Sequence, residues 1–373
     1  MKKPKQIKIT RPTLRPFSAY TPSFRAVLAS ERLTMGKVGK EFEEKLASYL
    51  GVKHCVVVSS CTSGLMLAMR GLGLTGEVIL PSFTFAASGL PLVWNSLKPV
   101  FADCDPETFC IDPTSVERLI TPNTSAIIAT HVFGVPCDVA RLQKMADTHK
   151  LRLVYDSAHA FGSVKDGVKV GNFGDVEVFS CSPTKVLTTG EGGIVATNNE
   201  SLADFVRRGR NYGDDGASKK SFPGLSARMS EFNAALGLVS LKDLPKNLTS
   251  RRAMAEYFKK KMRACEPRLC FQHIPHGVET TYKDLSVLID PALGYSRDEL
   301  QEFFEKQNIE TRKYFFPPLH KHATYAGAKS DSLSTTERVA SQVLSLPLYS
   351  HITKKEVDAV VSTFKKFHDS HKA

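Results

Sequence analysis

Residues 178–193 read VFSCSPTKVLTTGEGG, and this stretch decides how the chain is interpreted. An apolar run ends here in small polar residues, Lys185 follows, and a glycine-rich turn comes next. A lysine that only solubilises a surface does not need such neighbours. A lysine that attacks a carbonyl needs surroundings that lower its pKa, and glycines let the backbone approach closely. The stretch therefore predicts a nucleophilic Lys185 at the end of a buried strand.

The length and composition are those of a soluble globular protein with two domains. The chain has 373 residues, of which 42% are apolar and 24% charged. No apolar run approaches the length of a membrane span, and the N-terminus lacks the apolar segment of a secretory signal. We therefore expect no contact with a membrane.

The eight cysteines are scattered, and none forms a CxxC pair or has zinc-ligand spacing. Several lie in apolar stretches, where a free thiol behaves as a small hydrophobic group. We expect reduced thiols, no metal site and a cytoplasmic location. The cysteines are Cys55, Cys61, Cys104, Cys110, Cys137, Cys181, Cys265 and Cys270.

The formal net charge of +12 favours anionic partners. The sequence has no nucleic-acid-binding signature, so nucleic acid is not an expected partner. The excess is either solvated surface charge or a field that attracts a diphosphate-bearing substrate. Seven basic residues precede the first acidic residue, Glu31: Lys2, Lys3, Lys5, Lys8, Arg11, Arg15 and Arg25.

The first three-fifths of the chain alternates short apolar runs with helical patterns, such as residues 138–149. Continuously apolar runs rich in Val and Ile are typical of strands buried on both faces. The pattern predicts an α/β domain with a mostly parallel, seven-stranded sheet. The expected strands lie within residues 54–60, 77–80, 98–102, 125–133, 151–156, 176–182 and 192–198.

The pattern changes in the last third of the chain. We expect a long helix at residues 247–264 and a strand at 282–290, then helices at 296–309 and 353–367. We therefore predict a large domain at residues 1–245, which includes an N-terminal arm, and a smaller α+β domain at residues 246–373. A cleft between two such domains is a usual place for a ligand.

Asp156 ends the expected strand LVYD, and His159 follows it closely. Ligands of open α/β sheets bind outside the carboxyl ends of strands, where a carboxylate can pair with a cation such as a protonated pyridine nitrogen. A strand-end Asp that only caps the following turn is the alternative.

Two further segments follow strands and could hold parts of a ligand. In SSCTSGLMLAM, Thr62 and Ser63 open a helix whose N–H groups could bind an anion, a role compatible with a plain N-cap. In PSFTFAAS, Phe83 or Phe85 could stack on a planar ring, and core packing is the alternative. A phosphate site, a stacking aromatic, a carboxylate and a lysine together describe a pyridoxal phosphate site.

These motifs resemble the DegT/DnrJ/EryC1/StrS family of sugar aminotransferases, which have the aspartate aminotransferase fold (fold type I) and work as homodimers. The resemblance covers nearly the whole chain. It is most specific in SSCTSGL, PSFTF, DSAHAFG, SPTKVLTTGEGG, RNYG, ARMSEFNAALG and LSLPLY.

The resemblance implies a role for each matching residue toward pyridoxal 5′-phosphate. Lys185 would be the Schiff-base lysine, and Asp156 would keep the ring nitrogen protonated. His159 would contact the ring hydroxyl, and Phe85 would stack on the ring in preference to Phe83. The phosphate would be bound by Thr62, Ser63 and Ser180. Ser226, two residues before Arg228, stands where relatives often carry an Asn that reaches the phosphate of the neighbouring subunit.

The resemblance implies transfer of an amino group from L-glutamate to a nucleotide-linked ketosugar, with 2-oxoglutarate and pyridoxamine phosphate formed on the way. A 4-keto-6-deoxyhexose is the expected acceptor. Dehydration of a ketosugar, transamination of a ketocyclitol and a non-catalytic role are the alternatives. The dehydrating branch carries a histidine in place of the lysine, so Lys185 argues against it.

The segment TRKYFFPPLHKH supplies further candidates for binding the sugar diphosphate, with solvated loop charge as the alternative. They are Arg312, Lys313 and His320. A cluster of Lys313 with Tyr314, Phe315 and Phe316 is the only hint of base stacking on nucleic acid. A pocket wall is the simpler interpretation of this cluster.

Overall fold

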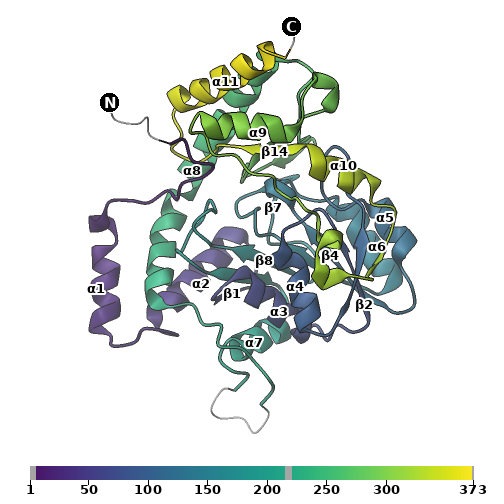
Figure 1. Ribbon diagram of the computed structural model, residues 1–373. Helices are drawn as coiled ribbons and strands as arrows, with labels where there is room; N and C mark the ends of the chain where they lie inside the picture. The colour runs from purple at the N-terminus through teal and green to yellow at the C-terminus, as the bar shows by residue number, and fades with distance from the viewer. Residues whose placement is uncertain (1–5, 215–220, 372–373) are drawn as a thin grey trace.

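The computed structural model describes residues 6–214 and 221–371 (Figure 1). Its centre is an eight-stranded sheet in the order β1-β9-β8-β5-β4-β2-β3-β13. Neighbouring strands run parallel except at β9, which is antiparallel to both β1 and β8. The strands are β1 His54–Val58, β2 Glu77–Pro81, β3 Lys98–Ala102, β4 Thr124–Thr130, β5 Arg152–Asp156, β8 Val176–Ser180, β9 Gly193–Thr197 and β13 Lys329–Ser330.

All seven strands expected from the sequence are present in this sheet, and the mostly parallel α/β architecture is confirmed. The expectation of seven strands was one too few. The eighth strand, β13, has only two exposed residues and joins the edge beside β3. So short a strand has no apolar run, and nothing in its sequence separates it from a loop.

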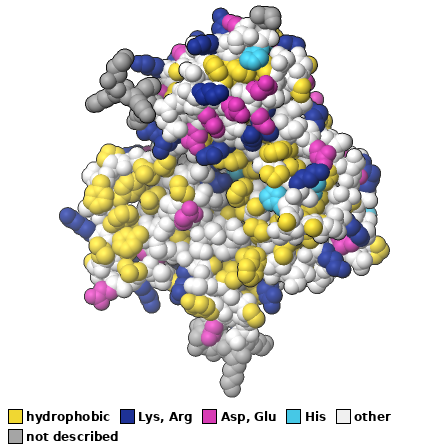
Figure 2. Space-filling model, viewed as in Figure 1, with side chains coloured by type: hydrophobic (Ala, Val, Ile, Leu, Met, Phe, Trp, Pro, Cys, Tyr) yellow, Lys and Arg dark blue, Asp and Glu magenta, His cyan; other side chains and the backbone are white. Residues whose placement is uncertain are grey.

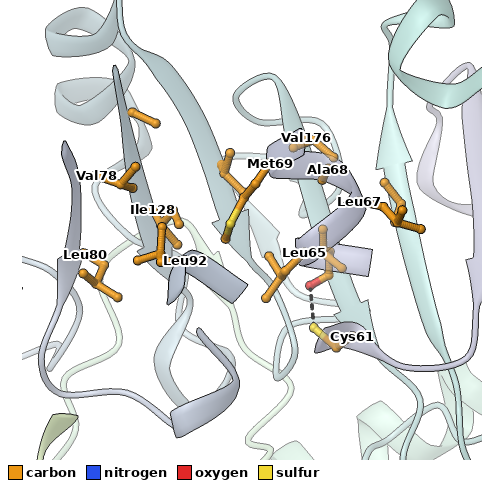
Figure 3. Packing of buried hydrophobic residues seen from close by; sticks show 14 of the residues in the cluster. Cys61, Leu65, Leu67, Ala68, Met69, Val78, Leu80, Leu92, Ile128 and Val176 are labelled. Atoms are coloured by element: carbon orange, nitrogen blue, oxygen red, sulfur yellow. Dashed lines mark hydrogen bonds between the residues drawn. The ribbon is translucent and has the colours of Figure 1, made fainter. Parts of the chain in front are cut away.

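Helices cover both faces of the sheet. On one face α3 (Cys61–Gly71) packs against Val78, Ile128 and Val176, with α4 (Ala86–Trp94) and α7 (Glu200–Gly209) beside it (Figure 3). The opposite face is covered by α2 Lys37–Leu50, α5 Pro113–Leu119, α6 Val139–His149 and α10 Ser334–Gln342. Burial on both faces explains why the strands are continuously apolar.

The C-terminal region adds a small antiparallel sheet, β10-β12-β14, formed by Cys270–Phe271, Leu285–Leu288 and Val343–Leu346. Helices α9 (Arg297–Lys306) and α11 (Lys354–Asp369) pack on it and confirm two of the predicted helices. Each begins with a capping box, in which the N-cap hydroxyl and a glutamate three residues later satisfy backbone N–H groups.

The long helix α8 (Glu231–Cys265) starts 16 residues before the predicted first residue, 247, so that prediction was wrong at its N-terminal end. The Ser230 side chain caps the helix, which then continues through Pro245. A proline removes one helical hydrogen bond and is usually a boundary signal, but packing along the helix overrides it here. The domain boundary at residue 245 stays a prediction: α8 runs through it, and Leu319 and Tyr325 pack into the core of the large sheet.

The remaining elements are helix α1, a third sheet and the short 3-10 helices. Helix α1 (Thr21–Ala29) packs beside α8, where the rings of Phe24 and Phe232 meet edge to face. Three short strands form a third sheet: β6 Val164–Lys165, β7 Val168–Lys169 and β11 Val278–Glu279. The 3-10 helices are η1 Phe17–Ala19, η2 Val132–Gly134, η3 Pro291–Leu293, η4 Leu319–Lys321 and η5 Ala323–Tyr325.

Within residues 6–214 and 221–371, the structure contains no helix that combines the length and apolarity needed to cross a bilayer. All eight cysteines are free thiols, and six of them are buried. Lys2, Lys3 and Lys5 of the basic N-terminal group lie outside the described residues.

Glu231, at the start of α8, joins this helix to α2. Its carboxylate is 2% exposed and accepts hydrogen bonds from the backbone N–H groups of Gly36, Val38 and Gly39 at 2.9–3.0 Å. These groups have no partner inside the helix, and the helix dipole favours a negative charge beside them. A Cβ on Gly39 would lie 2.7 Å from the carboxylate, so this contact also requires glycine.

We predict that Glu231→Ala lowers the free energy of unfolding by about 2–4 kcal/mol, because buried N–H groups at the start of α2 would lose their acceptor. Chemical denaturation measures the loss. Glu41→Ala is the control, because Glu41 lies on α2 in an exposed ion pair with Lys45 and should cost less than about 1 kcal/mol. Equal losses in the two variants would contradict the role given to Glu231.

Candidate active site

A cavity of about 360 Å³ lies at the carboxyl ends of β1, β2, β4, β5 and β8. Two pairs of residues from the C-terminal third of the chain, 283–284 and 314–315, form its opposite wall. This is the edge where ligands of open α/β sheets bind. Its lining includes Ser60, Cys61, Thr62, Thr84, Phe85, Thr130, Asp156, His159, Ser180, Ser182, Thr184, Lys185, Glu191, Lys283, Asp284, Tyr314 and Phe315.

Lys185 lies in this cavity, in the loop between β8 and β9, as the opening stretch predicts. Burial, followed by the positive charge of Lys283, lowers the pKa of its amine from 10.5 to about 8. Asp284, Cys61 and Asp156 act in the opposite direction. A neutral amine is the nucleophilic and basic form of lysine, so this cavity makes that form accessible near neutral pH.

The glycine-rich turn after Lys185 is fixed by neighbouring elements. The Asn233 side chain on α8 donates hydrogen bonds to the carbonyls of Thr189 at 2.7 Å and Glu191 at 2.9 Å. A Cβ on Gly193 would lie 2.4 Å from the Ser60 backbone, so only glycine allows this approach of β9 to the start of α3. The predicted close backbone approach is confirmed at this glycine.

Asp156 ends β5 with its carboxylate 3% exposed. It accepts hydrogen bonds from the Ser88 hydroxyl at 2.6 Å and from the Ala158 N–H at 3.0 Å. Behind Ser88, the hydroxyls of Thr84 and Thr130 continue the chain of hydrogen bonds. The carboxylate therefore caps the following turn and also lines the cavity, with acceptor capacity left for a cationic donor.

His159 lines the same cavity. Its Nδ1 accepts a hydrogen bond from the Phe133 N–H at 3.2 Å, and its ring lies about 6 Å from the rings of both Phe133 and Phe315, which also contact each other. Burial, followed by the charges of Lys185 and Lys283, holds its pKa well below the ordinary value. A neutral ring that accepts at Nδ1 carries its proton on Nε2, so His159 is a hydrogen-bond donor.

The start of α3 separates two residues predicted to act together. Thr62 lines the cavity, but Ser63 does not belong to the described lining. Its hydroxyl takes part in a capping box with Ser60, donating to the Ser60 carbonyl at 2.9 Å. Ser60 belongs to the polar turn in which an anion site was predicted, and it lines the cavity, although it was not among the predicted site residues. A serine followed three residues later by a second serine before an apolar run could have indicated its role as the cap. A phosphate contact of Ser63 stays a prediction.

The two phenylalanines of PSFTF have different environments. Phe83 is fully buried, with edge-to-face contacts to Phe109, Phe133 and Phe315. Phe85 is 57% exposed and lines the cavity, so its ring is the one available to a ligand. Stacking of Phe85 on a ligand ring stays a prediction.

Of two other predicted site residues, Ser180 lines the cavity and Ser226 does not. Ser180, at the end of β8, is 9% exposed and lines the cavity. Ser226 is exposed and outside the described lining, next to Tyr212 and Arg228. A hydrogen bond from Ser226, followed by the charge of Arg228, lowers the pKa of Tyr212. Ser226 therefore faces outward, where a contact with a neighbouring subunit remains a prediction.

The segment 312–320 was predicted as a pocket wall with diphosphate-binding candidates. Tyr314 and Phe315 line the cavity, while Arg312, Lys313 and Phe316 line an adjoining groove of about 380 Å³. His320 lies in neither lining; its Nδ1 hydrogen-bonds the buried Ser82 hydroxyl at 2.7 Å.

Lys283 and Asp284 were also missed as site residues. Both line the cavity, although the sequence analysis placed them in an ordinary strand. In the structure they precede β12, and two adjacent opposite charges before an apolar run are usually solvated, so no local signal distinguished them.

A lysine with a lowered pKa, a buried carboxylate and a helix N-terminus at the edge of this sheet define an enzyme of the fold type I class. The sequence profile of the DegT/DnrJ/EryC1/StrS aminotransferase family matches residues 18–365, and the chain belongs to this family.

Characterised relatives include two bacterial enzymes. The dTDP-4-amino-4,6-dideoxy-D-glucose transaminase of Escherichia coli is 33% identical over 95% of this chain and 96% of its own. The GDP-perosamine synthase of Caulobacter vibrioides is 33% identical over 88% of this chain and 90% of its own. The crystal structure of DesI in the presence of its TDP-sugar product superimposes with a TM-score of 0.93, at 36% identity, over 98% of this chain and 93% of that one.

The lowered pKa of Lys185 can be tested by its reactivity alone. After hydroxylamine treatment to remove carbonyl compounds, we predict that acetic anhydride labels Lys185 half-maximally near pH 8, because the neutral amine is the reactive form. Peptide mapping by mass spectrometry measures the labelling. Lys45, an exposed lysine on α2, is the internal control. Coincident profiles for the two lysines would refute the effect of burial.

Proposed function

We propose that this protein is a pyridoxal phosphate-dependent aminotransferase that moves an amino group from L-glutamate to a nucleotide-linked 4-keto-6-deoxyhexose. The observation that carries the proposal is the amine of Lys185, with its lowered pKa, in one cavity with the buried carboxylate of Asp156. The printed names of the E. coli and Caulobacter relatives and of DesI support a nucleotide sugar as the substrate class.

The residues present fit this cofactor. The N-terminus of α3, with Ser60, Thr62 and Ser180, offers N–H and hydroxyl donors for a phosphate. Asp156 is the carboxylate for a protonated ring nitrogen, and Phe85 offers an accessible ring face. His159 supplies an N–H donor for a ring oxygen. The bound cofactor would supply the electron sink that amino-group transfer requires.

The chain's own groups then perform the proton transfers. Lys185 Nζ, as a neutral amine, takes the proton from the α-carbon of the amino donor and acts as a general base. In the second half of the reaction it delivers a proton to the acceptor carbon of the sugar. Asp156 holds a proton at the ring nitrogen by accepting its hydrogen bond, and Ser88 and Ala158 keep the carboxylate oriented.

We also propose a homodimer whose active sites are completed across the interface, in the cytoplasm. Large hydrophobic side chains are exposed on the N-terminal segment, including Phe17 at 72% and Leu28 at 62%. Figure 2 shows hydrophobic side chains gathered at the left of the molecule, where Figure 1 places α1. Such a patch is typical of an interface. Free thiols support a reducing compartment. A single-chain mass by light scattering would contradict the dimer.

The function is tested by product analysis. Incubation with ¹⁵N-labelled L-glutamate and a panel of dTDP-, UDP- and GDP-linked 3-keto and 4-keto sugars should give a labelled 4-aminosugar in one member of the panel. Initial rates should follow ping-pong kinetics, because the amino group is held by the enzyme between the two substrates. Lys185→Ala should lower kcat by roughly 10²–10⁴-fold or more.

Three outcomes would contradict the proposal. A sequential rate law would exclude amino-group storage on the enzyme. A product that has lost water without gaining nitrogen would assign the dehydrating reaction. If the enzyme converts only ketocyclitols, the amino-group acceptor is a ketocyclitol and the proposed nucleotide-sugar acceptor is wrong.

A further inference from the structure

The wall of the cavity opposite the large sheet carries a buried ion pair with no part in the mechanism above. Lys283 and Asp284 are 4% and 5% exposed, and both line the cavity. Lys283 Nζ lies 2.9 and 3.0 Å from the two carboxylate oxygens of Asp284. The fold does not need such a pair, because burying two charges costs desolvation free energy that apolar side chains of similar size avoid.

The backbone that carries this pair is fixed from behind. Arg251 on α8 is 2% exposed and donates hydrogen bonds to the carbonyls of Tyr282 at 2.6 Å and Lys283 at 2.8 Å. On the other side, the N–H of Lys283 donates to the Phe133 carbonyl at 3.0 Å. Lys283 is therefore a positioned cation in the cavity, in contrast to a mobile surface lysine.

The charged residues that line the cavity indicate which of them can bind a negative group of the amino donor. Among the described lining residues, Lys185 and Lys283 are the two lysines, and no arginine is present. The pKa of His159 is lowered, so its imidazole is neutral. Lys185 must be free to act on the donor's α-carbon, so it cannot also serve as the permanent partner of an anion. Among the cations that this chain itself places in the described lining, Lys283 is therefore the one available to a negative group on the amino donor.

We propose that Lys283 binds the α-carboxylate of the amino donor and that Asp284 is its counter-ion while the donor is absent. The proposal rests on the proposed function. The α-carboxylate is bonded to the carbon from which Lys185 takes a proton, so it must lie in this cavity beside Lys185. A nucleotide diphosphate is separated from the reacting carbon by the sugar ring, and Arg312 and Lys313 of the adjoining groove, which pair with Glu310 and Asp298, are the candidate cations for it.

The test is Lys283→Met in the holoenzyme, titrated with L-glutamate while the visible absorbance of the cofactor is followed. The half-saturating glutamate concentration should rise about 10- to 100-fold, the loss expected for a charge-assisted hydrogen bond in a buried site. Lys283→Arg should recover most of this affinity. Isothermal titration with 2-oxoglutarate, which measures binding without turnover, should rank the three proteins in the same way: the wild type binds most tightly, then Lys283→Arg, then Lys283→Met.

Lys259→Met is the matched control. Lys259 is 8% exposed and bonded to Glu256 at 2.8 Å, but it lies outside the described lining of this cavity. Its replacement should change the glutamate affinity less than about threefold, the range expected for a substitution away from the binding site. An equal loss in both variants would assign a structural role to Lys283 and overturn the proposal.

The pH dependence separates binding from a purely electrostatic effect on Lys185. If Lys283 binds the carboxylate, Lys283→Met weakens glutamate binding at every pH at which the wild-type lysine is charged. If it only lowers the pKa of Lys185, the variant recovers wild-type affinity at high pH, and the proposal fails. Weaker binding of dTDP, with unchanged binding of glutamate, would also overturn it.

Failure of the proposed function has a different signature. If the wild-type absorbance does not respond to glutamate, the donor assignment fails. The titration with 2-oxoglutarate then still decides whether Lys283 binds a carboxylate: lack of binding to the wild type overturns both proposals. A wild-type response that Lys283→Met retains unchanged overturns the inference about Lys283 alone.

Discussion

The parallel alignment of β1, β2, β4, β5 and β8 is the constraint on which the site depends. Because their carboxyl ends meet at one edge, residues far apart in the chain gather there: Ser60, Thr84, Thr130, Asp156 and Ser180. Most side chains of these strands are buried and apolar on both faces, with Glu177 of β8 as a buried exception. The polar side chains that line the cavity gather at the edge of the sheet, outside the apolar clusters.

Helix α8 holds the two walls of the cavity in place. Near its start, Glu231 anchors α2 and Asn233 fixes the turn after Lys185; further along, Arg251 fixes the segment of Lys283 and Asp284. The relative position of the two walls determines how far the amine of Lys185 is buried from water. Burial is the largest cause of its lowered pKa, so α8 contributes to reactivity without contacting the reacting atoms.

The sequence allowed prediction of those features that have a local pattern. The seven buried strands have continuous apolar runs, and Lys185 and Asp156 stand directly after such runs. Features that depend on tertiary contacts could not be predicted in this way. Strand β13 has only two residues, and the Ser63 hydroxyl takes part in a helix cap. Lys283 and Asp284 precede an ordinary strand. Their roles follow from what folds against them, which local composition does not record.

The most direct test of the central claim identifies the lysine that binds the cofactor. The protein loaded with pyridoxal phosphate is reduced with sodium borohydride, digested and mapped by mass spectrometry. We expect a phosphopyridoxyl group on Lys185, because its neutral amine is the accessible nucleophile at the edge of the sheet. A group on Lys283, or none on any lysine of the cavity, would contradict the assignment of the site.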